Sequence, residues 1–155
     1  MMRYKRRMVK LGAFSVRLLA KNALCVCMCV NKSIPEVKLR DRYIYKVMTS
    51  NQWQAFRESG QFMGSPVDLA DGFVHMSRAS QLKATLDKWY ADQGHVVLLQ
   101  IDSTEIETDL KYEISRGGAE FPHLFAPLPL TAVGKTWDVS PEAGQYSLPK
   151  DLKAN

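Results

Sequence analysis

Cysteine is scarce in this sequence and confined to one region. The three cysteines, Cys25, Cys27 and Cys29, all lie within the first forty of 155 residues. A disulfide framework therefore does not hold the remainder of the chain together. Their alternating spacing lacks the two-residue spacer and the second cysteine pair of a zinc site, so we interpret them as part of a small apolar segment.

The sequence also lacks an excess of positive charge outside its N-terminal stretch. Residues 1–40 hold ten lysines or arginines and one acidic residue, Glu36, which gives a net charge of +9. The other 115 residues hold 11 basic and 15 acidic side chains, a net charge of −4. A mildly acidic domain is not expected to bind the negatively charged phosphate backbone of a nucleic acid. We therefore expect no DNA partner, and an RNA end stays only as an alternative to a small-molecule ligand.

A long uninterrupted apolar segment is absent as well. Residues 11–30 are broadly apolar, but Arg17 and Lys21 interrupt them, which argues against a membrane-spanning helix and a secretory signal. We interpret residues 1–40 as a basic extension, with two explanations open. One is an organelle transit peptide, and the other is a translation start placed upstream of the true one, near Met28 or later. We expect a cytoplasmic protein with no membrane partner.

Residues 41–140 show alternating strand and helix signals. Residues 42–48 alternate and are rich in β-formers, which predicts a strand. Thr49 and Gln52 have the spacing of a capping box, and Gly60 is a typical helix stop. Residues 64–66 and 71–72 are predicted to be turns, and further strands are predicted at residues 73–77, 95–101, 110–115 and 133–139. Residues 116–119 are predicted to be a loop, which residues 121–125 follow.

A second helix is predicted after Ser77 or Ser80, either of which has the chemistry of an N-cap. Its periodic apolar positions are Leu82, Leu86, Trp89 and Tyr90, and we interpret Trp53, Trp89 and Trp137 as core residues. Two main helices among about five strands predict one compact α+β domain. We expect residues 141–155 to be a loose C-terminal tail.

The strand predicted at residues 73–77 carries the most informative polar residues. Side chains two apart on a strand share a face, so Val74 and Met76 are expected in the core. His75 and Ser77 then lie on the opposite face with Phe73. A hydrogen-bonded structural histidine and a serine that only caps a helix are the alternative interpretations.

Polar residues on other strands are predicted to converge on the same cleft. Lys46 lies on the first strand, Glu113 shares a strand face with Ser115, and His123 follows Pro122. The loop at residues 116–118, Arg-Gly-Gly, can approach an anion closely. A serine-hydrolase triad is not supported, because Gly-x-Ser-x-Gly is absent. No close histidine spacing supports a metal site built from His75 and His123, so we expect none.

These residues together resemble the bacterial family called domain of unknown function 952, over about residues 42–139. The resemblance is carried by Ile-Tyr-Lys-Val at 44–47, Asp-Gly-Phe-Val-His-Met-Ser at 71–77, Glu-Ile-Ser-Arg-Gly-Gly at 113–118 and Phe-Pro-His-Leu at 121–124. It implies an ADP-ribosyltransferase-like fold, similar to that of RNA 2′-phosphotransferases, with a split twisted β-sheet around an NAD-binding cleft. Those enzymes place His or Arg on the first core strand, where this sequence has Lys46. Their hydroxyl and Glu positions correspond to Ser77 and Glu113.

Two functions stay open at this point. In the first, the domain binds an anionic small molecule, such as NAD or an ADP-ribose-containing ligand, and catalyses ADP-ribosyl or phosphate transfer. No cofactor is then required, because NAD enters as substrate. In the second, the domain is a non-catalytic ligand-binding or interaction module. The predicted catalytic residues are His75, Glu113 and His123, and the predicted ligand-binding residues are Lys46, Ser77, Arg116, Gly117 and Gly118.

Overall fold

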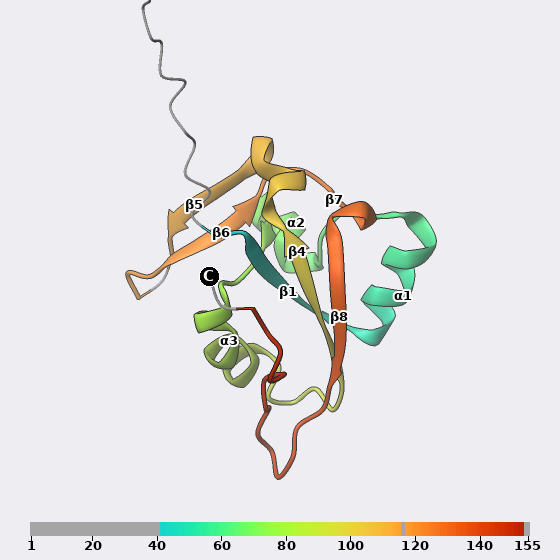
Figure 1. Cartoon of the computed structure of the whole chain (residues 1–155), viewed down its shortest axis with the longest axis vertical. Helices are drawn as coiled ribbons and strands as arrows, with labels where there is room; N and C mark the ends of the chain where they lie inside the picture. Colours follow the sequence, from blue (N-terminus) through green and yellow to red (C-terminus); the bar gives the residue numbers. More distant parts are fainter. Residues whose placement is uncertain (1–40, 116, 154–155) are drawn as a thin grey trace, which may run out of the picture. The chain divides into compact units, whose positions relative to one another are not determined.

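Two three-stranded antiparallel sheets form the framework of the domain (Figure 1). The computed structural model describes residues 41–115 and 117–153, so our interpretations of residues 1–40 and of Arg116 lie outside the described residues. The first sheet has the order β1-β4-β8, with β4 central because it is a continuous apolar segment that is buried on both faces. Its strands are β1 (Tyr43–Thr49), β4 (Val96–Asp102) and β8 (Val133–Val139).

The second sheet has the order β3-β6-β5 and meets the first sheet at one point. There, Tyr45 of β1 and Ser77, just after β3, exchange two backbone hydrogen bonds of 2.8 Å each. A further pair of two-residue strands, β2 and β7, lies outside both sheets. The strands are β2 (Gln61–Phe62), β3 (Val74–His75), β5 (Leu110–Ile114), β6 (Glu120–Leu124) and β7 (Leu128–Pro129).

The predicted first helix is confirmed as α1 (Ser50–Ser59). Thr49 is its N-cap and forms the predicted capping box with Gln52. Gly60 ends the helix with a φ of 75°, a left-handed conformation that favours glycine. These signals are local in sequence, so they identify both ends of the helix without knowledge of the rest of the fold.

A short helix that we did not predict, α2 (Pro66–Asp71), lies between the two predicted turns and takes up one residue of each. Ser65 caps it and forms a capping box with Asp68, while proline occupies the first helical position. Gly72 ends the helix with a φ of 81°. The domain is therefore α+β with three α-helices in the described residues, rather than with the two that were predicted.

The second predicted helix exists as α3 (Leu82–Trp89), but neither Ser77 nor Ser80 caps it. A single 3-10 turn at Ala79–Gln81 precedes it, and two other 3-10 segments, Ser103–Asp109 and Leu130–Ala132, connect strands elsewhere. Trp89 is exposed rather than part of the core. Tyr90 takes the inward position instead, and its hydroxyl donates to the Val47 carbonyl.

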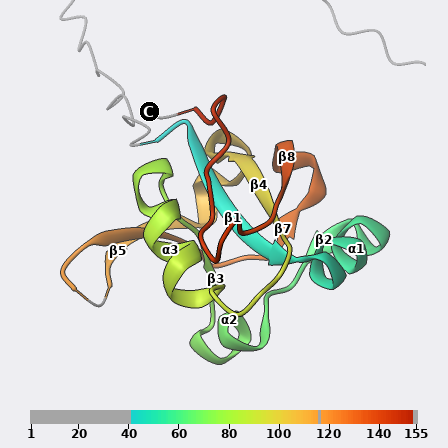
Figure 2. The same ribbon diagram turned by 90° about the horizontal axis from the view of Figure 1, so that it is seen from below.

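The first sheet is packed on both faces. One face and the second sheet enclose a core that includes Met48, Phe56, Met76 and Leu99. The other face is covered by α3 and by the C-terminal segment, which runs over β1 (Figure 2). All described residues belong to one compact unit, and no helix in residues 41–115 or 117–153 is long and apolar enough to cross a membrane.

The expectation of a loose tail after residue 140 is wrong. Tyr146 is fully buried in the second core cluster, and its hydroxyl donates to the carbonyls of Tyr90 and Gln93. Farther along, the Lys153 carbonyl accepts a hydrogen bond of 2.6 Å from the Tyr45 hydroxyl. The Pro- and Gly-containing composition of this segment predicted a tail, whereas one aromatic residue anchors it.

Candidate functional site

His75 and His123 lie directly opposite each other on β3 and β6. Their ring centroids are 5.4 Å apart, and the rings are nearly perpendicular at 71°. Strand alternation predicts this face correctly, because Val74 and Met76 are buried in the core as expected. We call His75 and His123 the imidazole pair.

Lys46 of β1 and Asp68 of α2 form a buried ion pair that contacts His75. The Lys46 ammonium contacts an Asp68 oxygen at 2.9 Å and donates to the His75 carbonyl, also at 2.9 Å. The side chains of Lys46 and Asp68 are 7% and 2% exposed, respectively, so both charges are removed from water. Such a pair fixes its neighbours, because neither charge can move without leaving the other buried and unpaired.

Asp68 also orients the His75 ring. Its second carboxylate oxygen accepts hydrogen bonds from His75 Nδ1 at 2.7 Å and from the His75 backbone N–H at 2.9 Å. Burial alone would raise the pKa of Asp68, but the His75 hydrogen bond and the Lys46 charge outweigh burial and hold that pKa far below its ordinary value. Because an ionised carboxylate only accepts hydrogen bonds, Nδ1 of His75 carries a proton, and Nε2 is the atom that can exchange one.

The second imidazole is oriented in the same way from a different strand. Nδ1 of His123 lies 2.9 Å from a Glu113 oxygen, and the His123 side chain is only 7% exposed. Glu113 itself is half exposed on β5. The predicted association of His75, His123 and Glu113 is thus observed, with Nε2 again the nitrogen that is free of the orienting carboxylate.

The Phe73 ring packs against both rings of the imidazole pair. Phe73 stacks on His123 with a centroid distance of 4.1 Å and an angle of 21°. The same ring lies 4.7 Å from His75 and 5.3 Å from Phe125. These contacts restrict both imidazoles and exclude water from one side of them, which strengthens electrostatic interactions at the site.

Charged groups at the rim determine what the site can attract. Lys111 is the register partner of His123 on the neighbouring strand, and its ammonium lies 4.2 Å from the Phe125 ring centroid. Lys111 makes no ion pair with any described residue. On the opposite side, the exposed Asp71 carboxylate lies 3.2 Å from His75 Nε2. The rim thus offers one ammonium to an anion, and Asp71 competes for His75.

Of the predicted ligand-binding residues that the structure describes, Lys46 lies at the site, whereas Ser77, Gly117 and Gly118 lie elsewhere. Lys46 is in the site, but its ammonium is occupied by Asp68 and by the His75 carbonyl. Ser77 is buried and hydrogen-bonds with Thr85 of α3 at 3.1 Å, so its hydroxyl is engaged away from the imidazole pair. Gly117 and Gly118 form the exposed tip of the β5–β6 hairpin. This tip begins beyond Glu120, three strand residues from His123, or about 10 Å.

Sequence reasoning missed Asp68 and Asp71, which lie on the undetected α2. The signal was present, since Ser65-Pro66-Val67-Asp68 combines an N-cap serine, a proline at the first helical position and an acid three residues after the cap. Lys111 and Phe125 were also missed. Lys111 shares a strand face with Glu113 on β5, and Phe125 directly follows the end of β6, two residues after His123.

The described carboxylates and imidazoles do not form a metal-binding cluster. No three His, Cys, Asp or Glu side chains of residues 41–115 and 117–153 are placed to hold one ion. Each orienting carboxylate instead contacts an imidazole through Nδ1. The arrangement suits proton transfer and anion binding by the side chains themselves.

The fold and the site define a small α+β domain with a paired, carboxylate-oriented imidazole site. The family model described as "Protein of unknown function (DUF952)" matches residues 47–136, more than half of the 155-residue chain. The chain therefore belongs to this family, as its resemblance predicted.

Solved structures of one relative have a similar fold. The X-ray crystal structure of protein CC0527 from Caulobacter crescentus is 42% identical, with a TM-score of 0.65, over 68% of this chain and 93% of that chain. Its solution NMR structure, also 42% identical, gives a TM-score of 0.62 over 68% of this chain and 90% of that chain. No curated protein matches the chain.

Proposed function

We propose that the imidazole pair binds the phosphate group of a small molecule and transfers it by acid–base catalysis. The observation that supports this most directly is the shared geometry of His75 and His123. Each donates Nδ1–H to a separate carboxylate, and the centroids of the two nearly perpendicular rings are 5.4 Å apart. Two imidazoles that are each oriented through Nδ1 can act as base and acid in one reaction once a substrate displaces the Asp71 carboxylate from His75 Nε2.

The proposed step moves one proton at each imidazole. Nε2 of the more exposed His75 accepts the proton of the attacking hydroxyl, from water or an alcohol. Nε2–H of the protonated His123 donates its proton to the leaving oxygen. One phosphorus–oxygen bond forms while the other breaks, so the two imidazoles finish with their protonation states exchanged. Solvent then restores the starting state.

Charge complementarity supports a phosphate ligand in particular. The Lys46–Asp68 pair is neutral as a unit, so Lys111 and any protonated imidazole supply the positive charge at the rim. Asp71 and Glu113 oppose them, which makes the site attractive to an anion chiefly when the imidazole pair is protonated.

NAD or an ADP-ribose-containing ligand belongs to the same proposal as a narrower possibility. We propose an ADP-ribosyltransferase-like arrangement because two antiparallel sheets meet at a single bridge between Tyr45 and Ser77. That arrangement is compatible with the split sheet of those enzymes. The engagement of Lys46 with Asp68 argues for phosphate chemistry over ADP-ribosyl transfer, because Lys46 stands where the transferases place a ligand-facing residue.

A non-catalytic binding module is the second candidate. The observation that favours it is the 3.2 Å contact between Asp71 and His75 Nε2, which occupies the nitrogen that catalysis requires. In that case the site would bind phosphate without turnover.

The test is an assay of the full-length chain against phosphorylated RNA ends, small phosphate esters, NAD and ADP-ribose. Turnover should fall by about 10²–10⁴-fold in His75→Ala and in His123→Ala, the range expected for loss of an acid–base group. His95→Ala is the matched control, because His95 is the third histidine of the chain and contacts Ser50 instead.

Each outcome separates the candidates. Turnover that requires both His75 and His123 supports the enzyme. Phosphate binding without turnover supports the module and refutes catalysis. If no phosphate compound binds, both candidates fail.

A further inference from the structure

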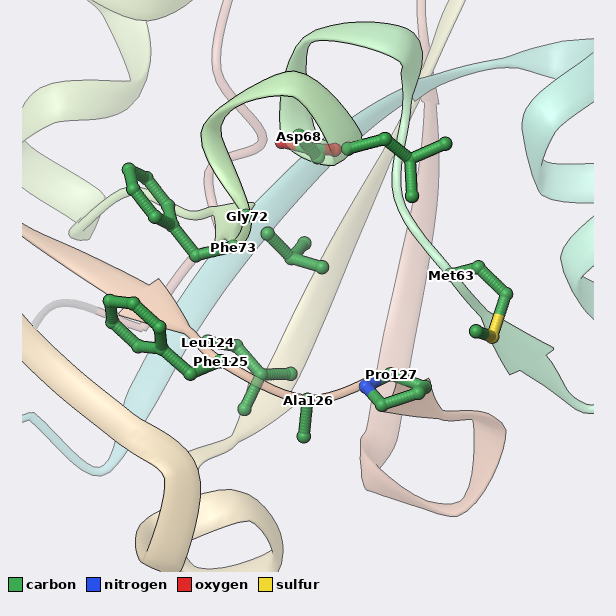
Figure 3. Close-up of a pocket in the computed structure, with 10 residues that line it drawn as sticks. Met63, Asp68, Gly72, Phe73, Leu124, Phe125, Ala126 and Pro127 are labelled. Atoms are coloured by element: carbon green, nitrogen blue, oxygen red, sulfur yellow. The ribbon is translucent and has the colours of Figure 1, made fainter.

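A pocket lined mainly by apolar side chains, and also by Asp68, adjoins the imidazole pair (Figure 3). Its volume is about 190 Å³. Figure 3 shows Phe73 and Phe125 at one end and Met63 at the other, with Leu124 and Ala126 between them. The walls that matter below are Met63, Leu69, Phe73, Leu124, Phe125 and Pro127.

The pocket and the imidazole pair share an aromatic wall. Phe73 lines the pocket and also stacks on His123 at 4.1 Å. Phe125 lines the pocket and carries the Lys111 ammonium 4.2 Å from its ring centroid. The pocket and the imidazole pair are therefore neighbours that share the Phe73 side chain.

Two of the pocket walls are exposed, so no part of residues 41–115 or 117–153 fills the pocket. Met63 and Leu69 are 62% and 63% exposed, although both are large and apolar. Exposed apolar side chains that converge on a hollow are typical of a ligand site, whereas single ones need no explanation.

The dimensions limit the occupant. An apolar cavity of roughly 150 Å³ holds a benzene ring, so this pocket accepts one ring and not a fused pair with its substituents. A ligand that also reaches the imidazole pair must pass the edge of Phe73 and Phe125. It therefore needs a short spacer between its ring and its phosphate.

We propose that the pocket is the specificity subsite for a phosphate ester that carries one planar apolar ring on a short spacer. This inference rests on the proposed phosphate site at the imidazole pair. The ring occupies the space between Met63, Leu69 and Leu124, and the phosphate lies beside His75, His123 and Lys111. Burial of the ring supplies affinity that the phosphate alone lacks.

The test compares two ligands that differ only in the ring. Binding of ethyl phosphate and of phenethyl phosphate to the full-length chain is measured by isothermal titration calorimetry. Phenethyl phosphate should bind about tenfold more tightly or better, because a ring leaves water. In the double variant Met63→Ser/Leu69→Ser this preference should fall to about threefold or less, with unchanged affinity for ethyl phosphate.

Val67→Ser is the matched control for the pocket variant. Val67 lies on α2 beside Asp68, has the same 63% exposure as Leu69, and is not a wall of the pocket. Its substitution should leave the preference for phenethyl phosphate intact. Because all three substituted side chains are exposed, folding is expected to be preserved, and a thermal melt checks it.

Failure of this inference is distinguishable from failure of the proposed function. Equal affinity for the two esters, both lost in His123→Ala, would keep the phosphate site and overturn the subsite. A preference for phenethyl phosphate that survives Met63→Ser/Leu69→Ser would also overturn the subsite. If neither ester binds, both the proposed phosphate site and the subsite that depends on it are refuted.

Discussion

Asp68 links the two residue types that matter at the site, a buried lysine and an exposed imidazole. Its two oxygens accept hydrogen bonds from the Lys46 ammonium, from Nδ1 of His75, and from the backbone N–H groups of Ser65 and His75. One carboxylate therefore neutralises a charge, caps a helix and sets the tautomer of a candidate catalytic residue. This concentration of roles makes Asp68 the most sensitive single position at the site.

Replacing Asp68 with asparagine should lower the free energy of unfolding by about 3–5 kcal/mol, because Lys46 is left buried without a counter-ion. Urea denaturation of the full-length chain at neutral pH measures the loss. Asp71→Asn on the same helix is the control, since that carboxylate is half exposed, and we expect a change within about 0.5 kcal/mol. A loss in Asp68→Asn as small as in the control would contradict a buried ion pair.

The same substitution should have a pH-dependent effect. The pKa of Asp68 in the folded chain lies below its ordinary value, which is about 3.9 in an unfolded chain. As pH falls below about 4, the unfolded chain binds a proton that the folded chain still excludes, so the stability from Asp68 is progressively lost. The gap between wild type and Asp68→Asn should therefore narrow in acid, as urea denaturation across pH would detect. A gap of constant size would refute the low pKa.

At the scale of elements, α2 and β3 place the site through a single glycine. Gly72 ends α2 with a φ of 81° and directs the chain into Phe73 and β3. A Cβ added at Gly72 meets no atom within 4 Å. Any cost of a substitution there comes from backbone conformation alone, and the strain would act on the residues that hold His75.

Gly72→Ala should lower stability by about 1–2 kcal/mol, the cost of a left-handed conformation for an L-residue. Gly94→Ala is a matched control, because Gly94 has equal space around it and no positive φ. That control should be neutral or slightly stabilising. Thermal unfolding of both variants provides the comparison, and equal effects would exclude strain at the end of α2.

The elements that follow from local signals were predictable, and those that depend on distant contacts were not. Thr49, Gln52 and Gly60 defined α1, and alternation placed Val74 in the core and His75 opposite it. Alternation could not predict the hydrogen bond between the Ser77 and Thr85 hydroxyls. Nor could it predict the ion pair between Lys46 and Asp68, which are 22 residues apart in the sequence. The six residues of α2 are too few to show helical periodicity, so only its capping signals could predict this helix.

At the scale of the whole molecule, the C-terminal segment belongs to the fold. Residues beyond β8 cover the face of the first sheet that is opposite the site (Figure 2). Tyr146 anchors this cover beside Leu82 and Leu86 of α3. Helix α3 and the C-terminal segment thus hold one face of the first sheet in place, while its other face supports the second sheet and the imidazole pair.

Tyr146→Ala should therefore destabilise the domain by about 3–5 kcal/mol, as expected for loss of a buried aromatic side chain. Its exposed neighbour Gln145 provides the control, and Gln145→Ala should change stability by no more than about 0.5 kcal/mol. Chemical denaturation with guanidinium measures both. An unaffected Tyr146→Ala variant would restore the interpretation of residues 141–155 as a loose tail.

The proposed function depends most directly on the tautomers and accessibility of the imidazole pair. Nitrogen-15 NMR of the histidine rings in the full-length chain measures both, with His95 as an internal reference. We predict that the neutral forms of His75 and His123 carry the proton on Nδ1, and that ethyl phosphate shifts their Nε2 signals while leaving those of His95 unchanged. A neutral form of either ring with its proton on Nε2 rather than Nδ1, or Nε2 signals of His75 and His123 that do not respond to the ester, would contradict a paired acid–base site.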